Sequence, residues 1–281
     1  MAGVLNVVAT PIGNLDDMSL RAIATLKNVD YVAAEDTRHS RKLLQHFGID
    51  KPMLSLHEHN EQQRAKEIIG KLREGKHVAL VSDAGTPLIS DPGYTLVKEV
   101  RAQGFQVRPI PGSCAAIAAL SVSGLATDKF QFEGFLPASA SARRQRLIAL
   151  SRHTNTLVFY EAPHRILALC QVLIECFGED RRAVFARELT KTYETIHGGI
   201  LKEQWAWLNN DANQQRGEFV VMVEGFQEEA EATSLTLEAQ HLMDLLVAEL
   251  PPNRAAQLAA KYFKLPKKVF YDYALGKKLD I

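Results

Sequence analysis

The stretch HVALVSDAGTPLISDPG (77–93) joins a short apolar run to a loop that is dense in glycine, proline and aspartate. An apolar run of four to eight residues that ends in turn-forming residues is typical of a strand buried within a sheet. Four other segments share this form, so five strands are expected, at 4–10, 30–36, 53–58, 77–83 and 105–112. Amphipathic segments that favour helices separate them, and this alternation predicts an α/β fold with a mostly parallel sheet.

The helices expected between these strands cover 19–29, 40–48, 60–75 and 91–104. Asn60 followed by Gln63 predicts a capping box at the start of the third helix, in which each side chain bonds to the other residue's backbone amide.

The second half of the chain begins again with β-branched and aromatic runs, at 156–165, 183–190, 192–200 and 217–225. These predict a second α/β domain with more antiparallel pairing than the first. We place the division near Gly134–Pro137, giving domains over 1–134 and 135–226. The acidic segment FQEEAEATSLT (226–236) predicts a linker over 227–236, and 237–281 predicts a small helical domain. Its last two helices read equally well as a nucleic-acid-binding helix-turn-helix or as a packed helical hairpin.

The bulk properties exclude several classes of protein. The 281 residues have a formal net charge of zero, so no overall positive field attracts nucleic acid, and local patches must supply any such contact. The three cysteines lack the spacing of a disulfide framework or a zinc ribbon, which fits a reducing, cytoplasmic setting. No apolar run is long enough to cross a membrane. Neither G-x-G-x-x-G nor G-x-x-x-x-G-K-[ST] occurs, and no metal site is expected.

Three loops that follow expected strands are rich in glycine and proline: ATPIGN (9–14), SDAGTP (82–87) and PIPGSCAA (109–116). Ligands of open α/β sheets bind beyond the carboxyl ends of the strands. Glycine lets the backbone approach a ligand closely, whereas one such loop alone would only turn the chain. Three together predict a small-molecule pocket.

Charged clusters stand at other strand ends. The first contains Glu35, Asp36 and Arg38, the second Tyr160 and Arg165, and the third Arg187, Glu188 and Lys191. Each could be structural, through helix capping by Asp36 or through plain strand-end ion pairs. Each could also face a cleft between the two domains, where binding sites are common.

Eight stretches, in this order, carry a resemblance to a known family: ATPIGNL, AEDTRHSRKLLQHFGI, LHEHNE, LVSDAGTPLISDPGY, PIPGSCAAIAALSVSGL, GFLP, FYEAPHR and ARELTKTYETIHGG. They resemble the tetrapyrrole-methylase superfamily, and within it the branch that methylates the ribose 2′-hydroxyl of small-subunit ribosomal RNA. The resemblance spans residues 4–225, and the C-terminal helices look like that branch's small helical domain. It implies two α/β domains with a cofactor cleft between them, S-adenosyl-L-methionine as cofactor, and a homodimer. The implied substrate is a cytidine of the 16S ribosomal RNA decoding region, within the small ribosomal subunit.

The resemblance also implies site residues, taken position by position. Those expected to bind the cofactor are Pro11, Ile12, Gly13, Asp83, Ala84, Gly85, Pro111, Gly112, Ser113, Cys114, Ala115, Tyr160, Arg187 and Glu188. The first loop, T-P-I-G-N, departs from the longer glycine-rich loop of the tetrapyrrole-modifying members, which favours an RNA substrate.

A ribose hydroxyl is a weak nucleophile, so a nearby base should accept its proton. Asp36 and Glu35 are the candidates, and His57 is a further one. Arg38, His57, Arg165 and Lys191 are expected to contact the RNA. Two alternatives remain: a small-molecule methyltransferase of the same fold, acting for example on a tetrapyrrole, and a non-catalytic RNA-binding factor for ribosome assembly.

Overall fold

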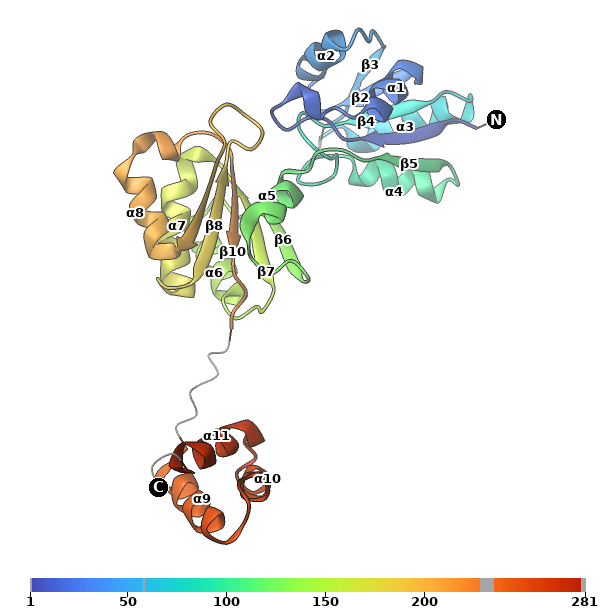
Figure 1. Cartoon of the computed structure of the whole chain (residues 1–281). Coiled ribbons are helices and arrows are strands. Elements are labelled where there is room, and N and C mark those ends of the chain that lie inside the picture. The colour runs from blue at the N-terminus through green and yellow to red at the C-terminus, as the bar shows by residue number, and fades with distance from the viewer. Residues whose placement is uncertain (1, 58, 228–234, 279–281) are drawn as a thin grey trace. The chain divides into compact units, whose positions relative to one another are not determined.

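The computed structural model describes residues 2–57, 59–227 and 235–278 and divides into two compact units, 1–226 and 227–281 (Figure 1). Most of the expected linker, 228–234, lies outside the described residues. The first unit contains two sheets, and the second contains three helices.

The first sheet confirms all five expected strands. Its strands are all parallel and lie in the order β3-β2-β4-β1-β5. They are β1 (Val4–Val8), β2 (Tyr31–Ala34), β3 (Met53–Ser55), β4 (Val78–Val81) and β5 (Gln106–Ile110).

Helices cover both faces of this sheet, as the alternating pattern predicts. On one face the core is shared with α1 (Leu20–Asn28) and α2 (Thr37–His46), through residues such as Leu26 and Leu44. On the other face it is shared with α3 (Glu61–Arg73) and α4 (Tyr94–Ala102), through residues such as Ile68 and Leu96. Because both faces are buried, the inner strands β2 and β4 are apolar along their length rather than alternating, whereas the edge strand β5 exposes Gln106 and Arg108.

The expected capping box of Asn60 and Gln63 is wrong. Asn60 does precede α3, but its side chain makes no hydrogen bond to the first turn of that helix. Its Oδ1 accepts from the amide of His57 at 2.9 Å, and its Nδ2 donates to the carbonyl of Ser55 at 3.2 Å. The side chain therefore ties α3 back to the end of β3.

The neighbouring strands β1 and β4 form the branch point of the sheet. After β1 the chain crosses to β2 on one side, and after β4 it crosses to β5 on the other. The loops that follow β1 and β4 therefore part from one another at the carboxyl edge, which is where open α/β sheets bind ligands. Thr10 and Gly85 join these two loops through backbone hydrogen bonds of 2.8 and 3.1 Å.

The second sheet is mixed, with one parallel pair and three antiparallel ones, which confirms the expected change of character. Its order is β6-β7-β10-β8-β9. The strands are β6 (Phe130–Phe135), β7 (Thr156–Glu161), β8 (Arg182–Arg187), β9 (Thr195–Ile200) and β10 (Phe219–Val223). Since β6 already belongs to this sheet, the division expected near Gly134–Pro137 falls at the end of that strand.

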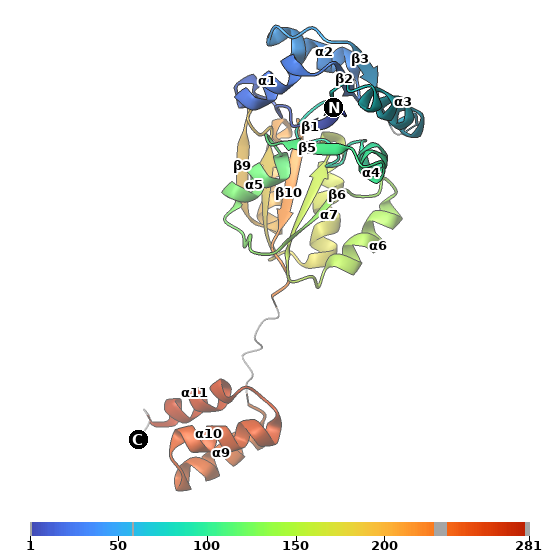
Figure 2. The same ribbon diagram turned by 90° about the vertical axis from the view of Figure 1, so that its right-hand side faces the viewer.

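Helices pack on both faces of the second sheet (Figure 2). One face carries α6 (Ala140–Leu150), α7 (Ile166–Phe177) and α8 (Leu201–Asn210). The opposite face carries α5 (Ala115–Ser123), whose Ala116 and Ala119 pack against Val184 and Val220. Ile12 and Cys114, from loops of the first sheet, join the same cluster, so α5 joins the two sheets.

The described part of the second unit is helical, as expected. Helices α9 (Leu237–Glu249), α10 (Pro252–Phe263) and α11 (Lys267–Lys278) enclose a core that includes Met243, Ala259 and Phe270. Three short 3-10 helices lie in the first unit, at Leu15–Asp17, Pro163–Arg165 and Ala212–Gln215. Among the described helices of both units, none combines the length and the apolar character that crossing a membrane requires.

Two phenylalanines on neighbouring strands test how the second sheet is stabilised. Phe159 on β7 is fully buried, whereas Phe130 on β6 is 41% exposed. We expect Phe159→Ala to lower the free energy of unfolding by about 3–5 kcal/mol, because it leaves a cavity in the core. Phe130→Ala should have a clearly smaller effect. Equal losses, measured by denaturant unfolding of the two variants, would contradict this packing.

Candidate functional site

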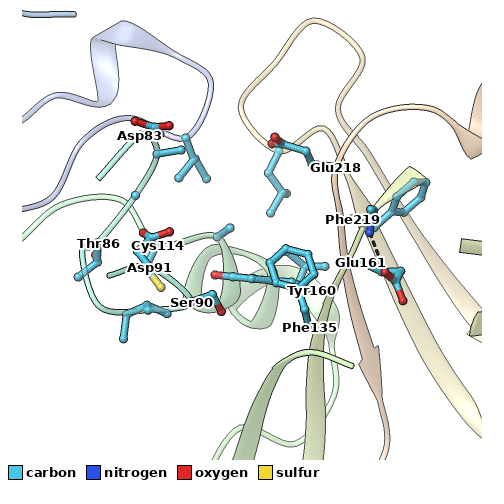
Figure 3. Close-up of a pocket in the computed structure, with 18 of the residues that line it drawn as sticks. Asp83, Thr86, Ser90, Asp91, Cys114, Phe135, Tyr160, Glu161, Glu218 and Phe219 are labelled. Atoms are coloured by element: carbon cyan, nitrogen blue, oxygen red, sulfur yellow. Dashed lines mark hydrogen bonds between the residues drawn. The ribbon is translucent and has the colours of Figure 1, made fainter. Parts of the chain in front are cut away.

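The main cavity of the first unit lies between the carboxyl edge of the first sheet and the second sheet (Figure 3). Its volume is about 490 Å³, within the usual range for small-molecule sites. The loop after β4 supplies one wall, with Asp83, Thr86 and Asp91. The C-terminal end of β7 and the start of the antiparallel strand β10 supply the facing wall.

Among the described residues, carboxylates are the only ionic side chains exposed to this cavity, and no described Lys, Arg or His accompanies them in the lining. They are Glu35, Asp83, Asp91 and Glu218. A fifth acidic residue, Glu161, lines the cavity through its main chain, and its side chain is fully buried beside Arg165. The remaining lining residues are mostly apolar. A cavity of this kind favours a ligand that is at once cationic and partly apolar.

Two of these carboxylates are held in an environment that disfavours their charge. Burial raises the pKa of Asp91, partly offset by a hydrogen bond with Ser82, and the nearby charge of Asp83 raises it further. Burial also raises the pKa of Glu161, which is only 2% exposed. The Oε1 of Glu161 accepts from the amide of Ala162 at 2.9 Å and lies 3.1 Å from Nε of Arg165. Its Oε2 has no hydrogen-bond partner among the described residues.

Aromatic rings form another part of the cavity wall. The ring of Tyr160 meets those of Phe132 and Phe135 edge to face, with centroids 4.9 and 5.7 Å apart. The Tyr160 hydroxyl accepts from the amide of Ala116 at 3.2 Å, which ties β7 to the first turn of α5. Burial, followed by the nearby Cys114, raises the pKa of Tyr160, so the phenol is neutral. Phe135 remains exposed toward the cavity and offers a flat apolar surface.

The backbone is strained on both sides of the cavity. Leu88 and Ser90 in the loop after β4, and Glu188 and Thr190 in the loop after β8, have positive φ angles. Non-glycine residues reach such angles at roughly 1–3 kcal/mol each, and they concentrate at functional sites.

A second cavity, of about 460 Å³, adjoins the first. Its lining includes Pro11 and Gly13 from the loop after β1, Lys191 from the loop after β8, and one face of α2. Four residues line both cavities and mark the junction between them: Ile12, Asp83, Ala84 and Glu218.

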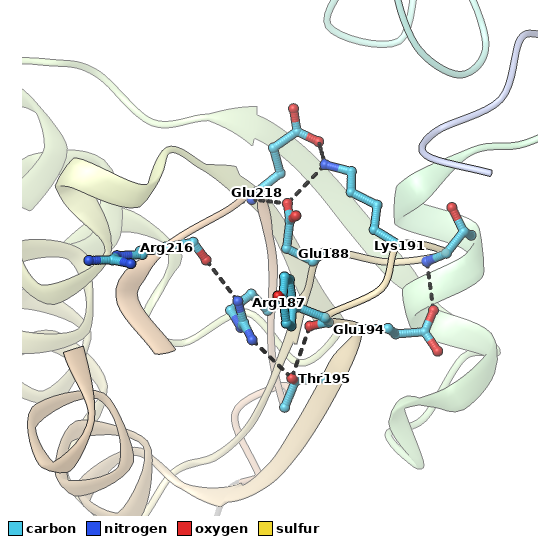
Figure 4. A network of polar contacts seen from close by, with 9 residues as sticks. Arg187, Glu188, Lys191, Glu194, Thr195, Arg216 and Glu218 are labelled. Atoms are coloured by element: carbon cyan, nitrogen blue, oxygen red, sulfur yellow. Dashed lines mark hydrogen bonds and ion pairs between the residues drawn. The ribbon is translucent and has the colours of Figure 1, made fainter. Parts of the chain in front are cut away.

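An ion-pair network holds the loop after β8 (Figure 4). Nζ of Lys191 lies 2.8 Å from Oε1 of Glu188 and 2.9 Å from Oε2 of Glu218. Burial lowers the pKa of Lys191, but its hydrogen bonds to these carboxylates outweigh burial and raise the pKa overall. The loop packs so closely on Gly13 that a Cβ there would lie 2.5 Å from Cγ of Lys191. The network therefore fixes the contact between the loops after β1 and β8.

The structure brings nine of the fourteen expected cofactor residues to these cavities. Those that line the main cavity are Ile12, Asp83, Ala84, Gly85, Cys114, Ala115 and Tyr160, and Pro11 and Gly13 line the second. The other five line neither cavity: Pro111, Gly112, Ser113, Arg187 and Glu188.

Two of these five, Ser113 and Arg187, make supporting contacts. The carbonyl of Ser113 accepts from the Thr86 hydroxyl at 2.9 Å. The guanidinium of Arg187 donates to the carbonyl of Arg216 and to the hydroxyl of Thr195 (Figure 4).

The two expected catalytic carboxylates are placed differently. Glu35 lines the main cavity, whereas Asp36 lines neither cavity. Asp36 caps α2 by accepting from the amide of Arg38 at 2.8 Å, and its Oδ2 pairs with the Arg38 guanidinium at 3.3 Å. This hydrogen bonding with Arg38 holds the pKa of Asp36 below its usual value.

Of the expected RNA contacts, only Lys191 lines a cavity. Arg38 is exposed and paired with Asp36. His57 contacts Asn60, 3.0 Å from its ring. Arg165 donates to the carbonyls of Leu136 and Pro137 and pairs with Glu161, so it supports the end of β7.

The sequence reasoning missed several lining residues. Within the stretch 77–93, Thr86, Ile89, Ser90 and Asp91 line the main cavity, as do Phe135, Ala186, Leu189, Phe219 and Val220 farther along. It also missed the face of α2 in the second cavity, formed by His39, Lys42, Leu43 and His46. Their i, i+3, i+4, i+7 spacing was the available signal. Among the residues described, no group of three or more His, Cys, Asp or Glu side chains could hold a metal ion.

Comparison with known proteins identifies the family. The model of the tetrapyrrole (corrin/porphyrin) methylases matches residues 4–204, and that of the RsmI C-terminal HTH domain matches residues 233–278. The chain is similar to ribosomal RNA small subunit methyltransferase I of Pseudomonas aeruginosa, with 54% identity over 99% of this chain and 98% of that protein. It is also similar to the protein of the same name from Escherichia coli O157:H7, with 51% identity over 97% of this chain and 95% of that protein.

Solved structures agree on the fold. Diphthine synthase superposes with a TM-score of 0.59 at 16% identity, over 79% of this chain and 90% of that chain. Uroporphyrin-III-C-methyltransferase from Thermus thermophilus superposes with a TM-score of 0.54 at 18% identity, over 79% of this chain and 94% of that chain. Taken with the sequence matches, which extend over both units, these likenesses place the chain in the tetrapyrrole methylase family, in the branch of the relatives named ribosomal RNA small subunit methyltransferase I.

Proposed function

We propose that this protein uses S-adenosyl-L-methionine to methylate the ribose 2′-hydroxyl of a cytidine in the decoding region of 16S ribosomal RNA. The observation that carries the proposal is the main cavity, which exposes the carboxylates of Glu35, Asp83, Asp91 and Glu218 without a lysine, arginine or histidine among the described lining residues. S-adenosylmethionine carries a sulfonium and an ammonium group against a single carboxylate, so its net charge suits such a cavity. Its transferable methyl group is made electrophilic by the positively charged sulfur.

The residues of the cavity match the parts of this cofactor. The exposed ring of Phe135, packed on Tyr160, suits a flat heterocyclic base. The carboxylates of Asp83 and Asp91 are acceptors for ammonium or hydroxyl groups. The main chain at Ala84 and Gly85 can approach the ligand closely, because Gly85 has no side chain and holds a φ of +81°.

The substrate hydroxyl should meet the cofactor at the junction of the two cavities, where Asp83 and Glu218 stand. Aligning the hydroxyl with the methyl group is the main task of the protein there. Glu218 is paired with Lys191. We therefore assign proton acceptance to Glu35 or to Asp83, whose Oδ1 accepts from the Asp36 amide at 3.2 Å.

Several features support an RNA substrate. The relatives with about half of their residues identical are named for small-subunit ribosomal RNA. In the second unit, α10 and α11 expose Arg254, Lys261 and Lys268 and also the rings of Tyr262 and Tyr271. Exposed cations interleaved with aromatic rings suit phosphates and unstacked bases. We propose further that the protein acts as a cytoplasmic homodimer on the small ribosomal subunit.

The reaction can be tested with methyl-labelled S-adenosylmethionine and small subunits that lack the modification. We expect one labelled nucleotide, a cytidine of the decoding region with the methyl group on its 2′-oxygen, mapped by mass spectrometry. Label in a tetrapyrrole instead of RNA would favour the small-molecule alternative. Binding of subunits without any transfer would favour the assembly factor.

Asp91→Asn should weaken S-adenosylmethionine binding about tenfold, the equivalent of roughly 1.4 kcal/mol, because a charged acceptor is lost from the cavity. Calorimetric titration measures this change. Asp128→Asn, at an exposed position outside both cavities, is the matched control. Equal affinities of the two variants would show that Asp91 does not contact the cofactor.

Asp91→Asn also tests how the stability of the folded protein depends on pH. Burial raises the pKa of Asp91 in the folded chain above its value in the unfolded chain. The folded state therefore loses stability as the pH rises through that raised pKa, because the buried carboxyl must then ionise. Asp91→Asn should therefore raise the melting temperature of the cofactor-free protein at neutral pH. The difference should disappear below about pH 4, where the carboxyl is protonated in both folded and unfolded chains. A difference that persists in acid would contradict this account.

Asp36→Asn tests which of the two carboxylates that follow β2, Glu35 or Asp36, could accept the proton of the ribose hydroxyl. Because asparagine caps helices as well as aspartate does, the variant should fold and keep its turnover number with RNA and cofactor saturating. Glu35→Gln and Asp83→Asn should each be compared with it under the same conditions, and at least one of them should lower the turnover number 100-fold or more. Loss of turnover in Asp36→Asn with a normal melting temperature would make Asp36 the base.

A further inference from the structure

We propose that the second cavity and the hollow that continues it form the path of the RNA strand, and that helix α2 contacts the phosphates beside the target nucleotide. The inference rests on the proposed function and assigns to it a substrate-binding surface. We call this surface the α2 groove; its residues are Pro11, Gly13, Leu15, His39, Lys42, Leu43, His46 and Lys191.

One face of α2 supplies the polar wall of the α2 groove. His39, Lys42, Leu43 and His46 follow i, i+3, i+4, i+7 spacing, so their side chains project from the same side of the helix. His39, Lys42 and His46 are exposed to solvent. A lysine is a strong phosphate ligand, and a histidine ring carries an N–H donor whether it is neutral or protonated.

The cation on the opposite wall, Lys191, is already paired with carboxylates. Lys191 is paired with both Glu188 and Glu218, so its ammonium group serves mainly to hold the loop after β8 against Gly13. Lys42, by contrast, has no ion-pair partner among the described residues. Lys42 is therefore the main positive charge available to a phosphate in the groove.

The groove also presents apolar surface beside these donors. Leu15 is 40% exposed and Leu43 is half-buried, and Pro11 lies in the same lining. A strand of RNA needs both kinds of surface, since its phosphates require cations while its sugars and unstacked bases pack on apolar groups.

The groove extends beyond the junction, which favours a chain over a small molecule. A further hollow, lined by Asn14, Asp16, Thr190 and Thr192, shares Gly13, Leu15, His46 and Lys191 with the second cavity. The opposite end of the groove reaches Asp83 and Glu218, which also line the carboxylate-rich main cavity. A nucleotide at that end would meet the cofactor, while its neighbours lay along α2.

The test compares Lys42→Ala with Arg41→Ala in the full-length protein. Arg41 is also exposed on α2 and carries the same charge, but it lines neither cavity. We would measure equilibrium binding to unmodified small subunits over a series of salt concentrations, and S-adenosylmethionine binding by calorimetry. Subunit binding does not depend on turnover, so this readout separates the groove from the reaction.

We expect Lys42→Ala to weaken subunit binding about five- to tenfold and to make the slope of log affinity against log salt shallower by about 0.7 to 1. Its affinity for S-adenosylmethionine should be unchanged, and Arg41→Ala should bind subunits within twofold of the unaltered protein. Equal subunit affinities and slopes for the two variants would overturn the proposal. So would a matching loss of cofactor affinity in Lys42→Ala, because the groove would then belong to the cofactor. Lys42-dependent binding of subunits that are never methylated would refute the proposed reaction and support the groove.

Discussion

Two backbone hydrogen bonds between Thr10 and Gly85 hold together the loops that leave β1 and β4, and the site is built around this contact. These strands are neighbours whose following connections run in opposite directions, so the loops would otherwise separate. The pairing keeps Ile12 beside Ala84 and Gly85 and so presents both loops to the same space. The third loop is held to the second through the hydroxyl of Thr86, which donates to the carbonyl of Ser113. All three loops therefore form one wall, against which α5 and the second sheet close the cavity.

The two adjoining cavities differ in charge, and that difference agrees with a reaction between a cation and a polyanion. The main cavity is lined by carboxylates without basic side chains among the described residues, whereas the second brings in His39, Lys42, His46 and Lys191. Each side favours the partner of opposite charge and disfavours the other. Asp83 and Glu218 stand where the two sides meet. This arrangement also explains how a chain with a formal net charge of zero can recognise RNA, since the charges that matter are separated locally.

The features that suit the site for binding are unfavourable to the stability of the unliganded fold. Glu161 is almost fully buried with one oxygen lacking a hydrogen bond, and Leu88, Ser90, Glu188 and Thr190 hold positive φ angles. Such strain persists only where the surrounding structure is well packed. Here the support comes from the second sheet, whose central strand β10 is buried along its whole length, and from the network around Lys191. A cationic ligand that neutralised the cavity would relieve part of the electrostatic strain.

The local pattern of residues predicted the first sheet with the helices between its strands, four of the five strands of the second sheet, and the C-terminal helices, because apolar period and turn residues are properties of neighbouring positions. It did not predict β6. It also predicted that the three loops after β1, β4 and β5 form one pocket, because parallel strands end at a common edge. The single residues Ile12, Asp83, Gly85, Cys114 and Tyr160 came from the family resemblance, and all five line the main cavity. The sequence could not separate Glu35 from Asp36. Both follow β2, and only the folded chain shows that Asp36 is used to cap α2 while Glu35 faces the cavity. The groove joins α2 to Lys191, and the main cavity joins Asp91 to Glu218. Each pair is more than a hundred residues apart in the sequence, so both cavities depend on how the second sheet packs against the first through α5. Tertiary structure decided them, because a charge acquires its role from the groups that packing brings around it.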